Sequence, residues 1–387
     1  MTIRHLYPAV EPSLNLDFAN SKRLDPRITF TRASTGTYTD ESGIIRTAAA
    51  NEARFDHDSD GNSLGLLIEE SRTNLWLDSD DPTQKGTANA SCTLDPSVLD
   101  PLGNSSGKIE ITAVNTYQLW RQTGFSLTSG SYTFSVYLKA GTISSVTLSS
   151  GNSPNAVFDI ANGAVTSETG CTAKIQSAAN GWFRCSITWT ATNTTEIRTW
   201  TTNQSIGSYY FVAAAQVEAG SFPTSYIPTS GSTVTRSADV ASISGTNFTS
   251  WYNQNGGTIF TSYSGVYHSP WTLGSSQSPR LILGWFDNEV QIYDGTSDTR
   301  VVFPGDYPTT TSTTKEAVGL DSQNLSAARD GSVNTKTHSS VITGLYSYAR
   351  LEIGLTSNTS RRLNGHISRL TYYPVRLPDA TLQALTL

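Results

Sequence analysis

The sequence is poor in charged residues and in the residues that favour helices. Charged residues make up 15% of the 387 residues, whereas an average soluble domain has about 25%. Methionine occurs once, while tyrosine occurs 17 times and tryptophan 8 times. Threonine and aromatic side chains fit a half-buried pleated surface, and Gly, Asn and Ser form tight turns. The composition therefore predicts a chain built of β-strands.

Several kinds of partner are excluded by what is missing. The net charge is −6 and there is no Lys/Arg cluster, which argues against nucleic acid as a partner. No segment approaches the roughly 20 apolar residues that cross a bilayer, so we expect no membrane insertion. Residues 1–9 lack an apolar core segment of the kind found in signal peptides. We therefore expect no signal peptide and synthesis in the cytoplasm.

Cysteine is also scarce. The three cysteines are Cys92, Cys171 and Cys185, and none is part of a Cys-x-x-Cys pair. The odd number and the spacing argue against a zinc site or a framework of disulfides. Isolated buried thiols are the favoured interpretation, although Cys171 and Cys185 could lie on neighbouring strands of one hairpin.

A two-residue hydrophobic period runs through residues 74–243. Residues 131–139 and 181–190 alternate apolar and polar side chains, and residues 209–217 are apolar on both faces, as in a central strand. Trp189 falls on the apolar side of its segment and is predicted to be core. Turn signals such as Asn162-Gly163 separate these runs at short intervals, which predicts a β-sandwich.

A second β-region follows a Pro/Ser/Gly-rich connection at residues 221–232. Residues 280–286 and 289–293 flank Asp287-Asn288, which predicts a hairpin, and Asp330-Gly331 is the strongest short turn signal in the chain. Residues 380–385, after Pro378, predict one or two helical turns. The first 73 residues are irregular and extended, and we expect them to fold against the next domain or another copy of the chain.

These patterns predict an all-β fold class with two tandem jelly-roll-type β-sandwiches preceded by an extended N-terminal attachment segment. The predicted boundaries are 1–73 for that segment, 74–243 for the first sandwich and 244–387 for the second.

Three groups of residues carry a resemblance to known families. Residues 16–19, 27–38, 50–58 and 65–74 closely resemble the N-terminal module of tailed-bacteriophage fibre and spike proteins. Gly181-Trp182-Phe183-Arg184 and residues 215–229 are similar to the jelly rolls, like carbohydrate-binding modules, that follow that module. Residues 328–332 and 363–367 resemble a concanavalin-A-like, laminin-G-type sandwich.

The resemblance implies a virion structural protein of a tailed phage, of fibre, spike or capsid-decoration type. Such a protein would sit on the virion surface, attach to other virion proteins through residues 1–73 and bind host-surface glycans. It also implies a homotrimer. A purely architectural capsid or tail protein without sugar binding is the alternative.

Glycan binding requires aromatic faces for the apolar side of a sugar ring and polar groups for its hydroxyls. Any single aromatic residue of a sandwich is more often core, and among the candidates Trp120 is preferred because polar residues flank it. The candidates are Tyr117, Trp120, Arg121 and Trp200 in the first sandwich and Trp271 and Trp285 in the second.

Residues 56–62 imitate the start of a calcium-binding loop. Asp56, Asp58 and Asp60 alternate before Gly61, but the twelfth position holds Leu67 instead of an acidic residue. A solvated turn is therefore favoured over a weak calcium site, and no other cofactor is predicted.

The sequence contains no catalytic motif that we can identify. The five histidines have no metal-ligand spacing, and there is neither a Gly-x-Ser-x-Gly elbow nor a Glu-x-Asp-x-Glu strand. We therefore predict that the protein is not an enzyme. Glycoside cleavage needs only two carboxylates about 5–10 Å apart, which distant positions could supply, so a glycan depolymerase is the less favoured alternative.

Overall fold

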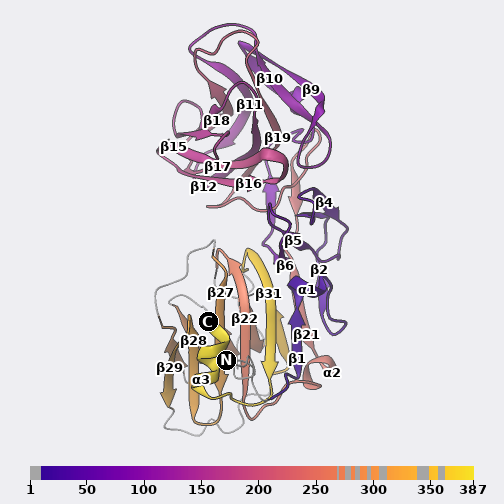
Figure 1. The fold of residues 1–387 in the computed structure, drawn as a ribbon, viewed down its shortest axis with the longest axis vertical. Coiled ribbons are helices and arrows are strands. Elements are labelled where there is room, and N and C mark those ends of the chain that lie inside the picture. The colour runs from indigo at the N-terminus through magenta and orange to yellow at the C-terminus, as the bar shows by residue number, and fades with distance from the viewer. Residues whose placement is uncertain are drawn as a thin grey trace, which may run out of the picture.

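The computed structural model describes residues 10–267, 270–274, 280–283, 288–293, 298–304, 312–337, 348–355 and 362–387. These residues form two β-sandwiches stacked end to end along the long axis of the molecule (Figure 1). The predicted all-β fold class is confirmed.

The middle sandwich consists of two antiparallel sheets with six described strands each. Phe134, Val136 and Leu138 alternate into its core, as the two-residue period predicts, and Trp189 lies in the same core. One sheet has the order β16 (Thr172–Ala178), β17 (Trp182–Thr190), β12 (Ser131–Ala140), β19 (Tyr209–Ala219), β10 (Ser105–Ile111) and β9 (Ala90–Leu99). The other has the order β15 (Ala164–Thr169), β14 (Asn155–Asp159), β13 (Ser145–Ser150), β18 (Thr194–Thr201), β11 (Gln118–Leu127) and β8 (Gly86–Ala88).

The second sandwich combines strands from both ends of the chain. Its larger described sheet has the order β29 (Ser332–Thr337), β28 (Asn324–Arg329), β27 (Thr314–Leu320), β22 (Gly257–Gly265), β31 (Gly365–Tyr373), β6 (Ser63–Ile68) and β5 (Phe55–His57), and β1 (Leu14–Asp17) also pairs with β31. The facing sheet has the order β2 (Thr29–Thr31), β21 (Val240–Ser244), β30 (Arg350–Ile353), β23 (Trp271–Gly274), β24 (Arg280–Leu283), β25 (Glu289–Tyr293) and β26 (Asp298–Val302).

This topology differs from the predicted division at residue 73. Leu14, Leu16 and Phe18 belong to the same core as Leu370 and Tyr372, so the N-terminal segment is an integral part of the second sandwich. The middle sandwich is inserted between β7 (Arg72–Asn74) and β20 (Val234–Arg236), which pair with each other where the chain leaves and returns. The two-residue hydrophobic period does not predict this insertion, because it indicates where strands lie but not which strands pair.

The predicted turns hold where the structure describes them. Strands β24 and β25 pair antiparallel on either side of the predicted hairpin, and β28 and β29 are joined through Asp330 and Gly331. Both turn residues have positive φ, 49° and 71°, as a two-residue hairpin turn with the right twist requires.

Helices are short. Within the described ranges they comprise α1 (Phe18–Ser21), α2 (Thr246–Thr249), α3 (Asp379–Thr386) and two 3₁₀ turns, Pro82–Gln84 and Ala179–Gly181. None of the described helices is long and apolar enough to span a membrane. All three cysteines are free thiols; Cys185 is buried, whereas Cys92 and Cys171 are partly exposed.

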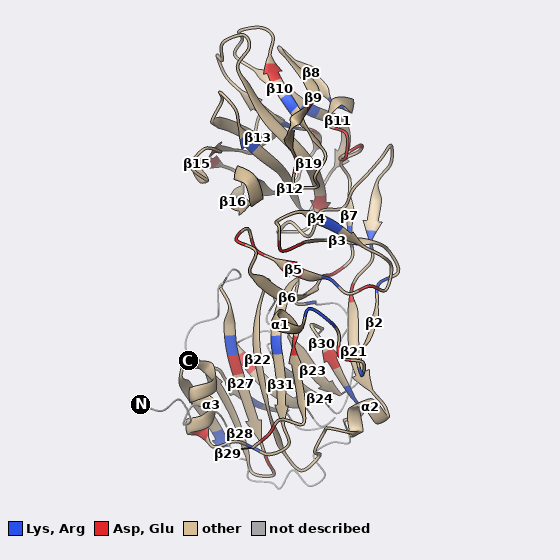
Figure 2. Cartoon of the chain, turned by 45° about the vertical axis from the view of Figure 1, so that its right-hand side comes forward, with Lys and Arg blue, Asp and Glu red and all other residues tan. Residues whose placement is uncertain are grey.

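A buried ion-pair cluster lies where the middle sandwich is inserted. Asp239 accepts from Arg32 at 3.1 Å and from Arg54 at 2.5 Å, and Glu69 contacts Arg54 at 2.8 Å and Arg236 at 3.5 Å. Figure 2 shows basic and acidic segments side by side between the two sandwiches. Arg32, Arg54 and Glu69 lie next to β2, β5 and β6, whereas Arg236 ends β20 and Asp239 precedes β21. The cluster therefore fixes the N-terminal segment to the segment that returns from the middle sandwich.

Candidate functional sites

The outer face of the β11–β18 sheet brings together aromatic and charged side chains. Residues opposite each other in the register share a face, so Trp200 lies beside Leu119 and Arg198 lies beside Arg121. The Tyr117 and Trp200 rings meet edge to face, with centroids 5.3 Å apart at 64°. Tyr117 is 43% exposed and Trp200 is partly exposed. Two aromatic surfaces are therefore available to a ligand here.

Arg198 contacts both the polar and the aromatic side chains of this face. Its guanidinium donates to Asn152 Oδ1 at 2.7 Å, Glu196 Oε1 at 2.8 Å and Ser149 Oγ at 3.2 Å. Its Cζ lies 5.7 Å from the Tyr117 ring centroid and 6.0 Å from that of Trp200, within the range of a cation–π contact. The guanidinium is thus fixed in place next to both rings.

Arg121 and Trp200 complete the arrangement. Arg121 Nη1 donates to Glu196 Oε2 at 2.7 Å, so one carboxylate is shared by two guanidinium groups. Trp200 Nε1 donates to Ser149 Oγ at 3.0 Å, which sets the orientation of the indole. We call Tyr117, Arg121, Glu196, Arg198 and Trp200 the aromatic–arginine face.

The structure brings together three of the predicted glycan-binding residues, Tyr117, Arg121 and Trp200, and corrects two others. Trp120 is only 1% exposed, its ring packs against Trp76 at 5.0 Å, and its Nε1 donates to the Pro82 carbonyl at 2.9 Å. Trp120 lies between Leu119 and Arg121, and in a strand that places it on the face opposite to theirs. Its polar neighbours misled the prediction because Arg121 belongs to the other face, while Gln118, on the same side as Trp120, is itself buried.

Trp271 is the second correction. It is fully buried, at 0% exposed, in the core of the second sandwich, and so cannot contact a glycan. Trp285 lies outside the described residues.

Two members of the aromatic–arginine face, Glu196 and Arg198, were not predicted from the sequence. The sequence of β18 does contain a pattern that indicates them, because Glu196, Arg198 and Trp200 alternate with Ile197 and Thr199. In a strand, the residues two and four positions before Trp200 lie on the same face as Trp200.

The loop that resembles a calcium site has a different geometry. Asp58 accepts from the Asn62 side-chain amide and from the backbone N–H groups of Asn62 and Asp60. Burial opposes ionisation, but these bonds, that of the Asn62 side chain first, hold the pKa of Asp58 below its usual range. Asp56 instead accepts from Thr39 N at 2.6 Å and contacts His366 Nε2 at 2.8 Å. In the described part of the chain, no three His, Cys, Asp or Glu side chains form a group that could hold a metal ion.

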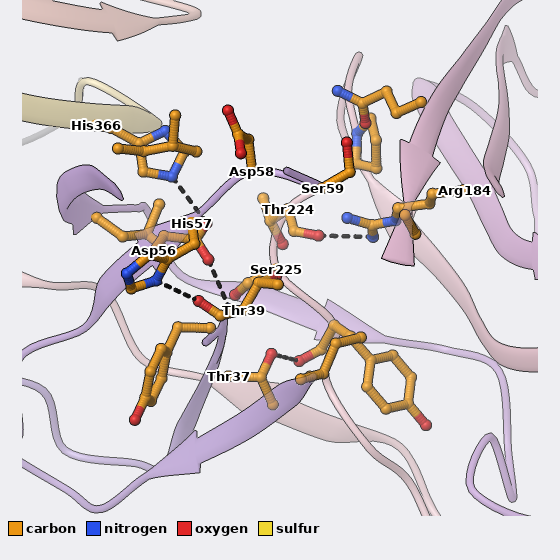
Figure 3. Close-up of a pocket in the computed structure, with 18 of the residues that line it drawn as sticks. Thr37, Thr39, Asp56, His57, Asp58, Ser59, Arg184, Thr224, Ser225 and His366 are labelled. Atoms are coloured by element: carbon orange, nitrogen blue, oxygen red, sulfur yellow. Dashed lines mark hydrogen bonds and ion pairs between the residues drawn. The ribbon is translucent and has the colours of Figure 1, made fainter. Parts of the chain in front are cut away.

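A pocket of about 450 Å³ lies between the two sandwiches. Figure 3 shows Asp56 and His366 on one side of it and Arg184, with the Thr224 carbonyl that it binds, on the other. Its walls come from residues 37–69 of the N-terminal segment, from the ends of β16 and β17 with residues 223–226, and from residues 264–265 and 364–366. These segments are far apart in the sequence, so strand patterns alone do not predict a pocket that all of them share.

Comparison with known proteins gives structural similarity only. No protein-family model matches the chain, and no curated protein matches its sequence. Among solved structures, the chain is similar to a carbohydrate-binding module of a Ruminococcus gnavus sialidase bound to α2,3-sialyllactose, with 17% identity over 35% of this chain and 83% of that chain and a TM-score of 0.31.

Two further structures are similar to the chain. One is domain 4 of an extracellular arabinanase from Geobacillus stearothermophilus in complex with arabinotriose, with 16% identity over 39% of this chain and 73% of that chain and a TM-score of 0.32. The other is the LG4-5 domain pair of the mouse laminin α1 chain, with 12% identity over 67% of this chain and 85% of that chain and a TM-score of 0.23. These values are too low to carry an argument about ligands.

Proposed function

We propose that the protein binds glycans through the aromatic–arginine face of the middle sandwich. The observation that carries the proposal is the pair of the exposed Tyr117 and the partly exposed Trp200, held beside Arg198. Aromatic faces cover the apolar side of a sugar ring, and fixed polar groups next to them orient its hydroxyls. The hydrogen bonds of Arg198 and Trp200 fix both side chains before a ligand arrives, which lowers the entropic cost of binding.

A glycan array probed with the full-length protein tests this function. We expect Trp200→Ala to weaken binding to any glycan that scores by at least about tenfold, since truncating a central aromatic anchor typically costs about 2 kcal/mol or more. Tyr209→Ala is the matched control, because Tyr209 is a partly exposed tyrosine on the opposite sheet of the same sandwich.

The array also separates the proposal from its alternatives. Unchanged glycan binding by Trp200→Ala would show that the aromatic–arginine face is not the glycan-binding site. No binding at all would favour an architectural role. Release of fragments from a host polysaccharide would favour a depolymerase.

We further propose that the protein is a virion component of a tailed phage and presents this face to the host surface as a homotrimer. The resemblance of residues 16–74 to fibre and spike modules supports this role. Several copies on one particle would convert weak sugar contacts into firm attachment through avidity. Imaging of intact virions at a resolution that places this chain, together with mass measurement of the purified protein, tests location and copy number.

A further inference from the structure

The acidic groups that line the pocket between the sandwiches are already engaged. Both oxygens of Asp56 are bonded, one to Thr39 N and one to His366. Asp58 is saturated by the amide groups of its own turn, and Glu69 by Arg54 and Ser225. These acids have little capacity left for a ligand.

Uncharged groups supply most of the remaining hydrogen-bonding capacity of the wall. Among the described residues, the hydroxyls of Thr39 and Ser59 and the side-chain amide of Gln176 have no protein partner, although all three residues line the pocket. Arg184 uses Nη2 for Ser135 and the Thr224 carbonyl, which leaves Nη1 as a further donor.

Charge and size narrow the class of ligand. Asp56 is bonded to His366 and Glu69 is paired with Arg54, and the charged side chains that line the pocket are three carboxylates and Arg184. The volume of about 450 Å³ falls within the 300–1,000 Å³ typical of small-molecule sites. Three carboxylates disfavour an anion here, and because they are already bonded they offer few acceptors to a cation. A ligand with many hydroxyls and no net charge therefore matches the free hydroxyl and amide groups.

We propose that this pocket binds a neutral sugar residue, at a site separate from the aromatic–arginine face. Its hydroxyls would pair with Ser59 and Thr39 on the N-terminal segment and with Gln176 and Arg184 on the middle sandwich. One ligand would then contact both the inserted sandwich and the sandwich into which it is inserted.

Ligand-observed NMR on the full-length protein tests the site. The probes are glucose, galactose and N-acetylglucosamine, with glucuronate and glucosamine as charged counterparts. We expect at least one neutral sugar to bind at millimolar concentration. We expect Ser59→Trp, which places a bulky ring in the pocket, to weaken that binding at least tenfold, and Gln176→Ala to weaken it several-fold. The pocket variants are compared in a Trp200→Ala background, which removes the contribution of the aromatic–arginine face, and Tyr209→Ala is the control that should leave this binding unchanged.

The outcomes are distinct. The proposal is overturned if none of the neutral probes binds, if only a charged probe binds, or if the bound sugar is lost in Trp200→Ala but retained in Ser59→Trp. Where Ser59→Trp alters the thermal unfolding transition, Gln176→Ala decides, because Gln176 is exposed on β16 and its side chain makes no hydrogen bond in the described structure. Unchanged affinity in that variant then counts against the site.

Discussion

The middle sandwich takes all its described strands from one continuous stretch, residues 86–219, whereas the second sandwich joins strands from both ends of the chain. In the second sandwich, Leu14 pairs with Tyr372 and Phe30 pairs with Ala241. Such pairs close very long loops, so their entropic cost must be repaid by packing and by the ion pairs at the insertion point. The difference shows that similar two-residue patterns can produce one self-contained unit and one that depends on distant segments.

Separating the two units should have the largest effect on stability. Residues 74–232, expressed alone, should keep a cooperative thermal unfolding transition, because they retain the whole core around Trp76 and Trp120. Residues 233–387 should not, because they lack β1, β2, β5 and β6 and the core side chains Leu14, Leu16 and Phe18. Calorimetry of both fragments checks this, and a cooperative transition in the second fragment would contradict the shared-sandwich topology.

Asp239→Asn should cause the next largest loss of stability. Asp239 pairs with Arg32 and Arg54, and all three side chains are fully buried. Removing one partner of a buried pair leaves an uncompensated charge and typically costs about 3–5 kcal/mol. Denaturant unfolding should show this loss. Asp25→Asn is the control, because the Asp25–Arg27 pair is partly exposed and should contribute less than about 1 kcal/mol.

Trp120 and Trp200 provide a comparison within the middle sandwich. Trp120→Ala should lower the free energy of unfolding by about 3–5 kcal/mol, because it opens a cavity beside Trp76. Trp200→Ala should cost less, because Trp200 is partly exposed, yet it alone should reduce glycan binding at equal folded fraction. Denaturant unfolding and glycan binding, measured on both variants, check the assignment; the reverse pattern would exchange the two roles.

Two buried glutamates should respond to pH in opposite directions. Burial opposes ionisation of Glu69, but Arg236 and Arg54 hold its pKa far below the ordinary range. Its contribution is therefore present above the unfolded-state pKa and is lost as the pH falls, a change of about 1–3 kcal/mol. Burial instead raises the pKa of Glu218 in the middle sandwich, so that residue favours the folded state less as the pH rises from the unfolded-state pKa toward its folded-state pKa.

Unfolding measured between pH 3 and pH 7 checks these signs. Glu69→Gln should flatten the acid loss of stability, whereas Glu218→Gln should leave that loss in place. An unchanged acid profile in Glu69→Gln would show that the ion-pair cluster does not control acid stability.

The sequence alone determined the strands, several turns and much of the core. Phe134, Val136, Leu138 and Trp189 follow from the two-residue period, and Asp330-Gly331 follows from the positive φ that its turn requires. These features are local, because side-chain alternation and turn geometry depend on neighbouring residues.

Only the tertiary structure decided which segments belong together. Trp120 and Trp200 both lie beside polar residues in the sequence, and the register of β11 against β18 sends one into the core and the other to the surface. Likewise, the pairing of Leu14 with Tyr372 and the pocket shared by Asp56, Arg184 and His366 join residues far apart along the chain. The physical reason is that burial and convergence are properties of packed sheets, and a strand pattern does not specify its partner.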